Sequence, residues 1–114
     1  MSIDIPFKRD YLMVVVLRDP KEKYWGSLLG LEPAGIAQRG IELSQWEQIL
    51  SLIRGGEALQ VALATRFFPM HRVELMYADE EGSGAESLGA TFFRRTGIAP
   101  LDFLGDAQAS SMRV

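Results

Sequence analysis

Residues 11–43 read YLMVVVLRDPKEKYWGSLLGLEPAGIAQRGIEL and divide into three apolar segments separated by two turns. The first segment, Leu12–Arg18, is too short to form a self-burying helix and contains three consecutive valines. Because β-branched residues favour extended backbone, this segment indicates a core strand. The charged segment Asp19–Lys23 ends it, since Pro20 has no N–H to donate to a sheet ladder.

The second and third segments continue the pattern of strand and turn. We expect strands over Tyr24–Glu32 and Ile36–Leu43, joined by the turn at Pro33–Gly35. Gly26 and Gly30 interrupt the second strand, where a missing side chain permits a sharp bend or the close approach of another backbone. Strongly bent strands favour a small barrel.

A helix is predicted next, over residues 44–54. Ser44 and Glu47 have the spacing of a capping box, in which each side chain satisfies a backbone amide of the first turn. Gly55-Gly56 ends the helix. One apolar face should pack on the sheet, and it comprises Trp46, Ile49, Leu50 and Ile53.

Two more strands should follow this helix. Leu59–Phe68 has strand character, and Pro69 then requires a tight corner. Arg72–Tyr77 alternates, which predicts a half-buried strand. Val73, Leu75 and Tyr77 would share one face of it, opposite Arg72, Glu74 and Met76.

The remaining residues suggest an appendage to this sheet. Residues 79–84 are acidic and small, as in a solvated loop, and Ala85–Thr96 predicts a helix with Gly97 as its C-cap. Pro100–Leu104 would add one helical turn. We divide the chain into a lead-in (1–10), a barrel (11–78) with its inserted helix (44–54), an acidic loop with a C-terminal helix (79–105) and a disordered tail (106–114).

The expected fold is therefore mainly β with added helices. Short bent strands joined by tight turns favour a small five-stranded barrel over a parallel sheet, because parallel strands need helical crossovers between them. The inserted helix falls between the third and fourth strands, and another helix follows the fifth.

The region Leu12–Tyr77 resembles the Sm-like family of small SH3-like barrels, which assemble into rings and often bind RNA. The first family motif is matched by Val15, Leu17, Asp19, Gly26-Ser27-Leu28 and Glu32, and the second by Phe67-Phe68-Pro69-Met70-His71-Arg72-Val73-Glu74-Leu75. His71 stands where bacterial Sm-like RNA chaperones keep a histidine. Ile36 replaces the family's base-binding asparagine, and Pro69-Met70 replaces Arg-Gly. The resemblance therefore implies the barrel more than the RNA site.

Composition narrows the classes of function. A chain of 114 residues fits one domain, and its net charge of -3 provides no general attraction for phosphates. The absence of cysteine excludes disulfides and thiolate metal sites. The first residues lack the apolar core of a signal peptide, and no apolar run has the length of a membrane span. We expect a cytoplasmic protein without a cofactor, a membrane partner or a DNA partner.

Few residues are candidates for chemistry. His71 is the single histidine, so neither a catalytic triad nor a histidine metal site is expected. Arg66, His71 and Arg72 are the candidate RNA-binding residues, as a basic rim at the ends of the last two strands. We expect Trp46 in the core, whereas the neighbours Tyr24 and Trp25 should point to opposite faces, with one of them outward.

Three hypotheses of function remain open. The first is a non-catalytic assembly module that forms a homo-oligomer by pairing exposed strand edges. Its candidate interface residues are Phe67, Phe68, Val73 and Leu75. The alternative is an RNA-binding Sm-like ring, and the second alternative is a small ligand-binding domain or enzyme.

Overall fold

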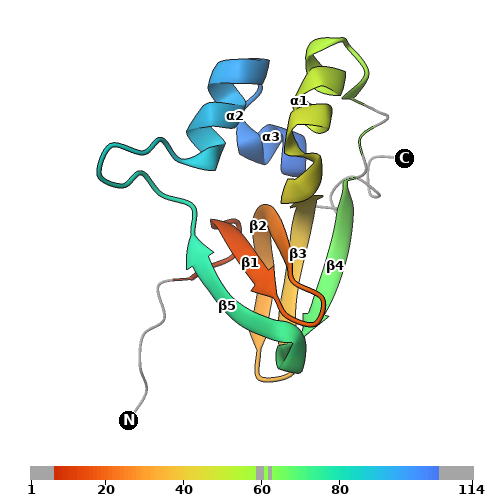
Figure 1. The fold of residues 1–114 in the computed structure, drawn as a ribbon, viewed down its shortest axis with the longest axis vertical. Coiled ribbons are helices and arrows are strands. Elements are labelled where there is room, and N and C mark those ends of the chain that lie inside the picture. Colours follow the sequence, from red (N-terminus) through yellow and green to blue (C-terminus); the bar gives the residue numbers. More distant parts are fainter. Residues whose placement is uncertain (1–6, 59–60, 62, 106–114) are drawn as a thin grey trace.

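The computed structural model describes residues 7–58, 61 and 63–105 (Figure 1). The predicted tail at 106–114, most of the lead-in and part of the predicted strand Leu59–Phe68 lie outside the described residues. The strands are β1 (Leu12–Leu17), β2 (Glu22–Glu32), β3 (Gly35–Glu42), β4 (Ala64–Pro69) and β5 (Val73–Ala78). The helices are α1 (Trp46–Arg54), α2 (Leu88–Thr96) and α3 (Pro100–Leu104), with 3-10 turns at Leu43–Gln45 and Met70–Arg72.

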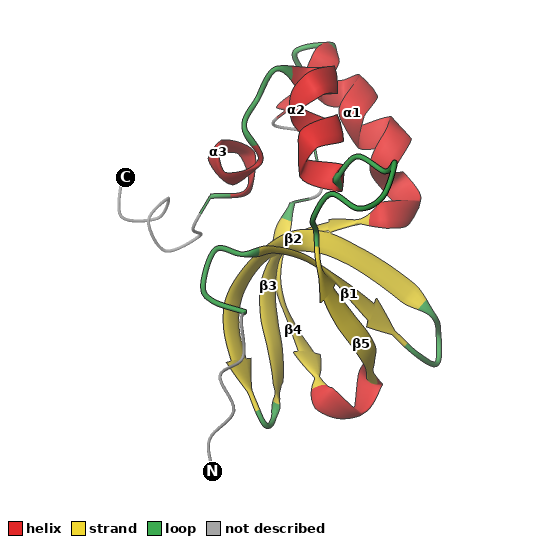
Figure 2. Cartoon of the chain, turned by 90° about the vertical axis from the view of Figure 1, so that its left-hand side faces the viewer, coloured by secondary structure: helices red, strands yellow, loops and turns green. Residues whose placement is uncertain are grey.

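The five strands form one antiparallel sheet of order β4-β3-β2-β1-β5. The prediction of a mainly β fold with added helices is confirmed, with α1 between β3 and β4 and two helices after β5. Among the described residues β4 and β5 do not pair with each other, so the sheet is open. Figure 2 shows its curved strands below the three helices.

Helices cover one face of this sheet. They lie together at one end of the molecule (Figure 1). Their apolar side chains form one cluster with those of the strands. Trp25 is the centre of this contact, since its ring lies 5.3 Å from that of Trp46 and 5.4 Å from that of Phe92. The helix face comprises Val14, Val16, Trp25, Ile41, Ile49, Leu50, Ile53, Phe92 and Leu104.

The opposite face is buried by the sheet itself. Both edge strands contribute to it, because Phe68 of β4 and Val73 of β5 belong to one apolar cluster. The curvature of the sheet brings its edges over that cluster. The inner face comprises Met13, Val15, Leu17, Tyr24, Leu28, Ile36, Phe68 and Val73. Since both faces are covered, Tyr24 and Trp25 are both buried, and the expectation that one of them points outward is wrong.

Two facing glycines permit the bend. Gly26 pairs with Gly40 across β2 and β3. A Cβ atom on Gly26 would lie 2.2 Å from the carbonyl oxygen of Arg39, and one on Gly40 would lie 2.2 Å from that of Trp25. Only glycine allows this close backbone approach.

The faces of β5 differ from the predicted alternation. A β-bulge shifts the register, so that Leu17 pairs with Val73 whereas Val16 pairs with Leu75. Since a one-residue shift moves the following side chains to the other face, Val73 and Met76 contact the inner face and Leu75 does not. The prediction that Val73, Leu75 and Tyr77 share a half-buried face is therefore wrong.

The start of α1 also differs from the prediction. A 3-10 turn over Leu43–Gln45 precedes the helix, its N-cap residue is Gln45, and no side chain caps either element. The capping box of Ser44 and Glu47 is therefore wrong. Glu47 instead accepts a hydrogen bond from Arg95 of α2 at 2.6 Å, which lowers the pKa of that carboxyl group. The apolar face of α1 is confirmed.

Asp79 connects the sheet to the C-terminal helices. Its carboxylate accepts hydrogen bonds from the backbone N–H groups of Leu88 and Gly89, each at 2.7 Å, at the start of α2. It also accepts one from Trp25 Nε1 at 3.0 Å. The helix begins at Leu88 and not at Ala85 as predicted, because Ser87 caps it; it ends as predicted at Gly97, whose φ is 77°. None of the helices in the described part of the chain has the length and hydropathy of a membrane-spanning segment.

Candidate assembly surface at the sheet edges

The two edges of the open sheet are β4 and β5. Within residues 7–58, 61 and 63–105, no further strand pairs with the outer side of either. An unpaired edge presents backbone N–H and C=O groups that another strand can use. Figure 1 shows β4 and β5 on opposite sides of the sheet, connected by the turn at Met70–Arg72.

The four predicted interface residues separate into two pairs. Phe68 and Val73 are 5% and 9% exposed, and the fold brings them together on the inner face. Phe67 and Leu75 are 54% and 45% exposed, and they lie on different edges. Tyr77 is also 45% exposed on β5, and sequence reasoning omitted it because the bulge is not visible in the alternation. The exposed apolar residues of the edges are therefore Phe67, Leu75 and Tyr77.

The β4 edge carries an arginine that turns inward. The guanidinium carbon of Arg66 lies 4.9 Å from the ring centroid of Tyr24, and its Nη1 donates to the carbonyl oxygen of Gly40 at 2.9 Å. Burial raises the pKa of the Tyr24 hydroxyl, as do Glu22 and Glu42. The contacts of Arg66 are thus made within its own chain.

Arg72 is also used within the chain. Its guanidinium donates to the carbonyl oxygens of Arg18 at 2.8 Å and Pro20 at 3.1 Å, and to Glu22 at 3.2 Å. His71 is exposed in the turn before β5. The predicted basic rim therefore consists of two arginines engaged with backbone and carboxylate oxygens, and one exposed histidine. These contacts compete with phosphate for the same donors.

Charge changes sign along β5. At its start, Arg18 Nη2 donates to the carbonyl oxygen of Val73 at 3.0 Å, and Lys21 Nζ lies 3.9 Å from the Glu74 carboxylate. The turn containing His71 and Arg72 adjoins the same end. Beyond the other end lies the acidic segment Asp79-Glu80-Glu81, in which Glu80 and Glu81 are exposed. The start of β5 therefore lies among three basic side chains, two of which pair with Glu22 and Glu74, whereas its end adjoins an acidic segment.

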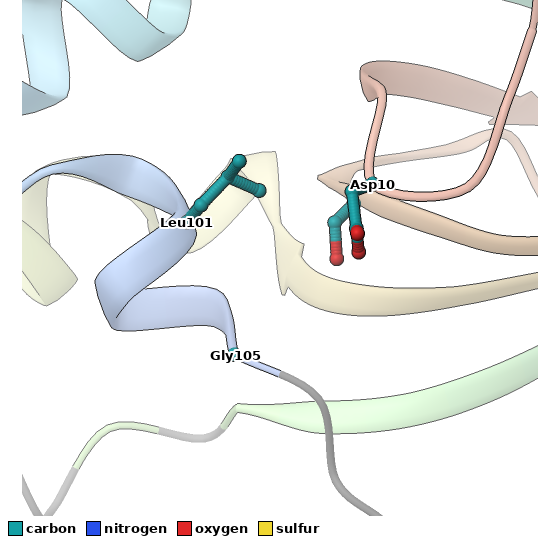
Figure 3. A pocket seen from close by; sticks show the side chains of 4 residues that line it. Asp10, Leu101 and Gly105 are labelled. Atoms are coloured by element: carbon teal, nitrogen blue, oxygen red, sulfur yellow. The ribbon is translucent and has the colours of Figure 1, made fainter. Parts of the chain in front are cut away.

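Two pockets lie beside Asp10. A pocket of about 210 Å³ is lined by Asp10, Ser27, Leu101 and Gly105, and Figure 3 shows the Asp10 carboxylate and Leu101 on its rim. A second pocket of about 350 Å³ adjoins Asp10 on the side of Asp79 and Glu80. No group of three or more acidic or histidine side chains is placed to hold a metal ion in the described part of the chain.

Comparison of this chain with protein-family models, with curated proteins and with solved structures found no match.

Proposed function

We propose that this domain is a non-catalytic assembly module, Sm-like or SH3-like in architecture, that forms a homo-oligomer by pairing its edge strands. The observation that carries the proposal is the open sheet, whose two edge strands expose Phe67, Leu75 and Tyr77. Large apolar side chains beside unpaired backbone groups are the features that strand pairing between chains would bury.

The inner face supports the same proposal. It is fully occupied by the chain's own side chains, including those of both edge strands. Curvature that brings both edge strands against one apolar cluster is expected of a small barrel. The inner face is therefore covered by the chain itself, and the outer sides of the edge strands remain exposed.

The mass in solution tests this proposal. Light scattering behind size exclusion, from micromolar to hundreds of micromolar protein, should give a multiple of the 12.7 kDa chain mass. The triple variant Phe67→Lys, Leu75→Lys, Tyr77→Lys should lower that mass while the circular dichroism spectrum stays unchanged, because these side chains are exposed. Phe93→Lys, at an equally exposed site on α2, is the matched control and should keep the wild-type mass. A monomeric wild type throughout this range would refute the proposal.

A further inference from the structure

The two edges differ in how well they are protected against pairing. On β4, Arg66 points inward and Pro69 ends the strand without an N–H to donate. Inward charges and prolines are the features with which natural sheets block edge pairing. The strand β5 contains no lysine, arginine or proline. Its bulge lies at the start, and Leu75–Ala78 pair regularly with β1. The accessible edge is therefore β5.

The apolar residues of β5 are spaced for contact with a similar strand. Leu75 and Tyr77 are two residues apart, so they project from the same face. In an antiparallel pair of two β5 strands centred on Met76, Leu75 of each copy lies opposite Tyr77 of the other. Opposed aromatic and aliphatic side chains stabilise antiparallel strands. The like charges of the two Glu74 residues are not opposed in this register.

The charge distribution selects the same orientation. Antiparallel pairing brings the start of each strand beside the end of the other. The start of β5, with Lys21 and Arg72 and their carboxylate partners Glu74 and Glu22, would then adjoin the acidic Glu80 and Glu81 of the second copy, and the two acidic ends would lie apart. Parallel pairing would place like charges together, which is unfavourable.

We infer that the partner of β5 is β5 of a second copy, paired antiparallel about a two-fold axis to join the two sheets into one. This inference rests on the proposed function and specifies its interface. Such a contact is isologous, with the same surface on both chains, and it yields a closed dimer.

Substitutions on each edge distinguish this dimer from other assemblies. Tyr77→Lys on β5 should convert the wild-type dimer to a monomer in light scattering. Phe67→Lys on β4, at a comparably exposed site, should leave the dimer intact. Circular dichroism of both variants is the check that they fold. An assembly that persists in Tyr77→Lys, or that Phe67→Lys breaks, would overturn the inference while leaving the proposed function standing.

Charge reversal tests the antiparallel orientation. The acidic variant is Lys21→Glu with His71→Glu, and the basic variant is Glu80→Lys with Glu81→Lys; all four side chains are exposed. Each variant alone places like charges at both ends of the contact, so its dimer dissociation constant should rise about tenfold or more at low salt. Mixed in equal amounts, the two variants should form a heterodimer with near wild-type affinity.

The variants taken alone give the decisive result. In parallel contact the two ends that carry Glu80 and Glu81 meet each other, so Glu80→Lys with Glu81→Lys would exchange one like-charge contact for another and keep the wild-type affinity, whereas in antiparallel contact it should weaken pairing. Restored pairing in the mixture shows that the loss comes from charge and not from misfolding. If the variants stay apart when mixed, or if each alone dimerises like the wild type, the inferred orientation is wrong. A wild type that is monomeric at every concentration overturns both this inference and the proposed function.

Discussion

The two faces of the sheet are buried by different means. On the helix face, Trp25 and its neighbours are covered by α1, α2 and α3, which come from later parts of the chain. On the inner face, Met13 and its neighbours are covered by other strands of the same sheet. Loss of the helices would uncover the first face without changing the strand order, whereas the second can be uncovered only if the edge strands move away from the cluster.

Polar contacts follow the same division. The helix face has an anchor in Asp79, which connects Trp25 to the first turn of α2, and a second in Arg39, whose Nε donates to the carbonyl oxygen of Leu104 at 2.6 Å. The inner face has Gln38, whose buried Nε2 donates to the carbonyl oxygens of Met13 and Tyr24, both at 3.3 Å. The helices are thus attached at a few points, and the strands along their length.

The largest effect should come from removing the centre of the helix face. Trp25→Ala deletes a fully buried ring, its contacts with Trp46 and Phe92 and its hydrogen bond to Asp79. We expect the free energy of unfolding to fall by about 3–5 kcal/mol in denaturant melts. Phe93→Ala, which removes an exposed aromatic ring on α2, is the control and should lower the free energy of unfolding far less. Equal costs for the two would contradict the central position of Trp25.

A smaller and more local effect is expected for Asp79→Ala. The substitution removes the acceptor of three hydrogen bonds, two of which hold the first turn of α2. The expected loss is about 1–3 kcal/mol. Hydrogen exchange should accelerate in α2 and α3 more than in β1 and β2, because only the helices depend on this anchor. Glu80→Ala, at the adjacent exposed residue, should change neither the free energy of unfolding nor the hydrogen exchange of the helices. If hydrogen exchange accelerated in the strands as much as in the helices, the stability of the two faces would not be independent.

Regular patterns in the sequence predicted most of the fold. The valines of β1, the glycines of β2 and β3 and the apolar face of α1 each act over a few residues, so local reasoning located those elements. The failures concern contacts between distant residues. Nothing in the alternation of Arg72–Tyr77 reveals the bulge that turns Leu75 outward, and nothing near Tyr24 and Trp25 indicates that both faces of the sheet are covered.

The candidate site was predicted less well, for the same reason. The sequence offered Phe67, Phe68, Val73 and Leu75 as interface residues, but Phe68 and Val73 pack inside because the sheet curves over them. From the sequence, Asp79 was assigned to an acidic loop. Its hydrogen bonds with α2 and Trp25 could not be predicted, because they depend on the fold. A carboxylate is recognised as an anchor only when the donors that surround it in the fold are known.

The smallest predicted effect compares two serines that precede helices. Ser87 Oγ accepts a hydrogen bond from the Ala90 N–H at 3.0 Å, whereas Ser44 lies in the 3-10 turn before α1 and caps nothing. Ser87→Ala should therefore cost about 1 kcal/mol, and Ser44→Ala only a few tenths. Paired denaturant melts with a common slope measure the difference. Since α2 belongs only to the helix face, the Ser87 variant should also raise hydrogen exchange in α2 while the strands keep their protection. If Ser44→Ala proved the costlier of the two, a capping box would form at α1 in solution, and the helix face would have a further anchor at its first helix.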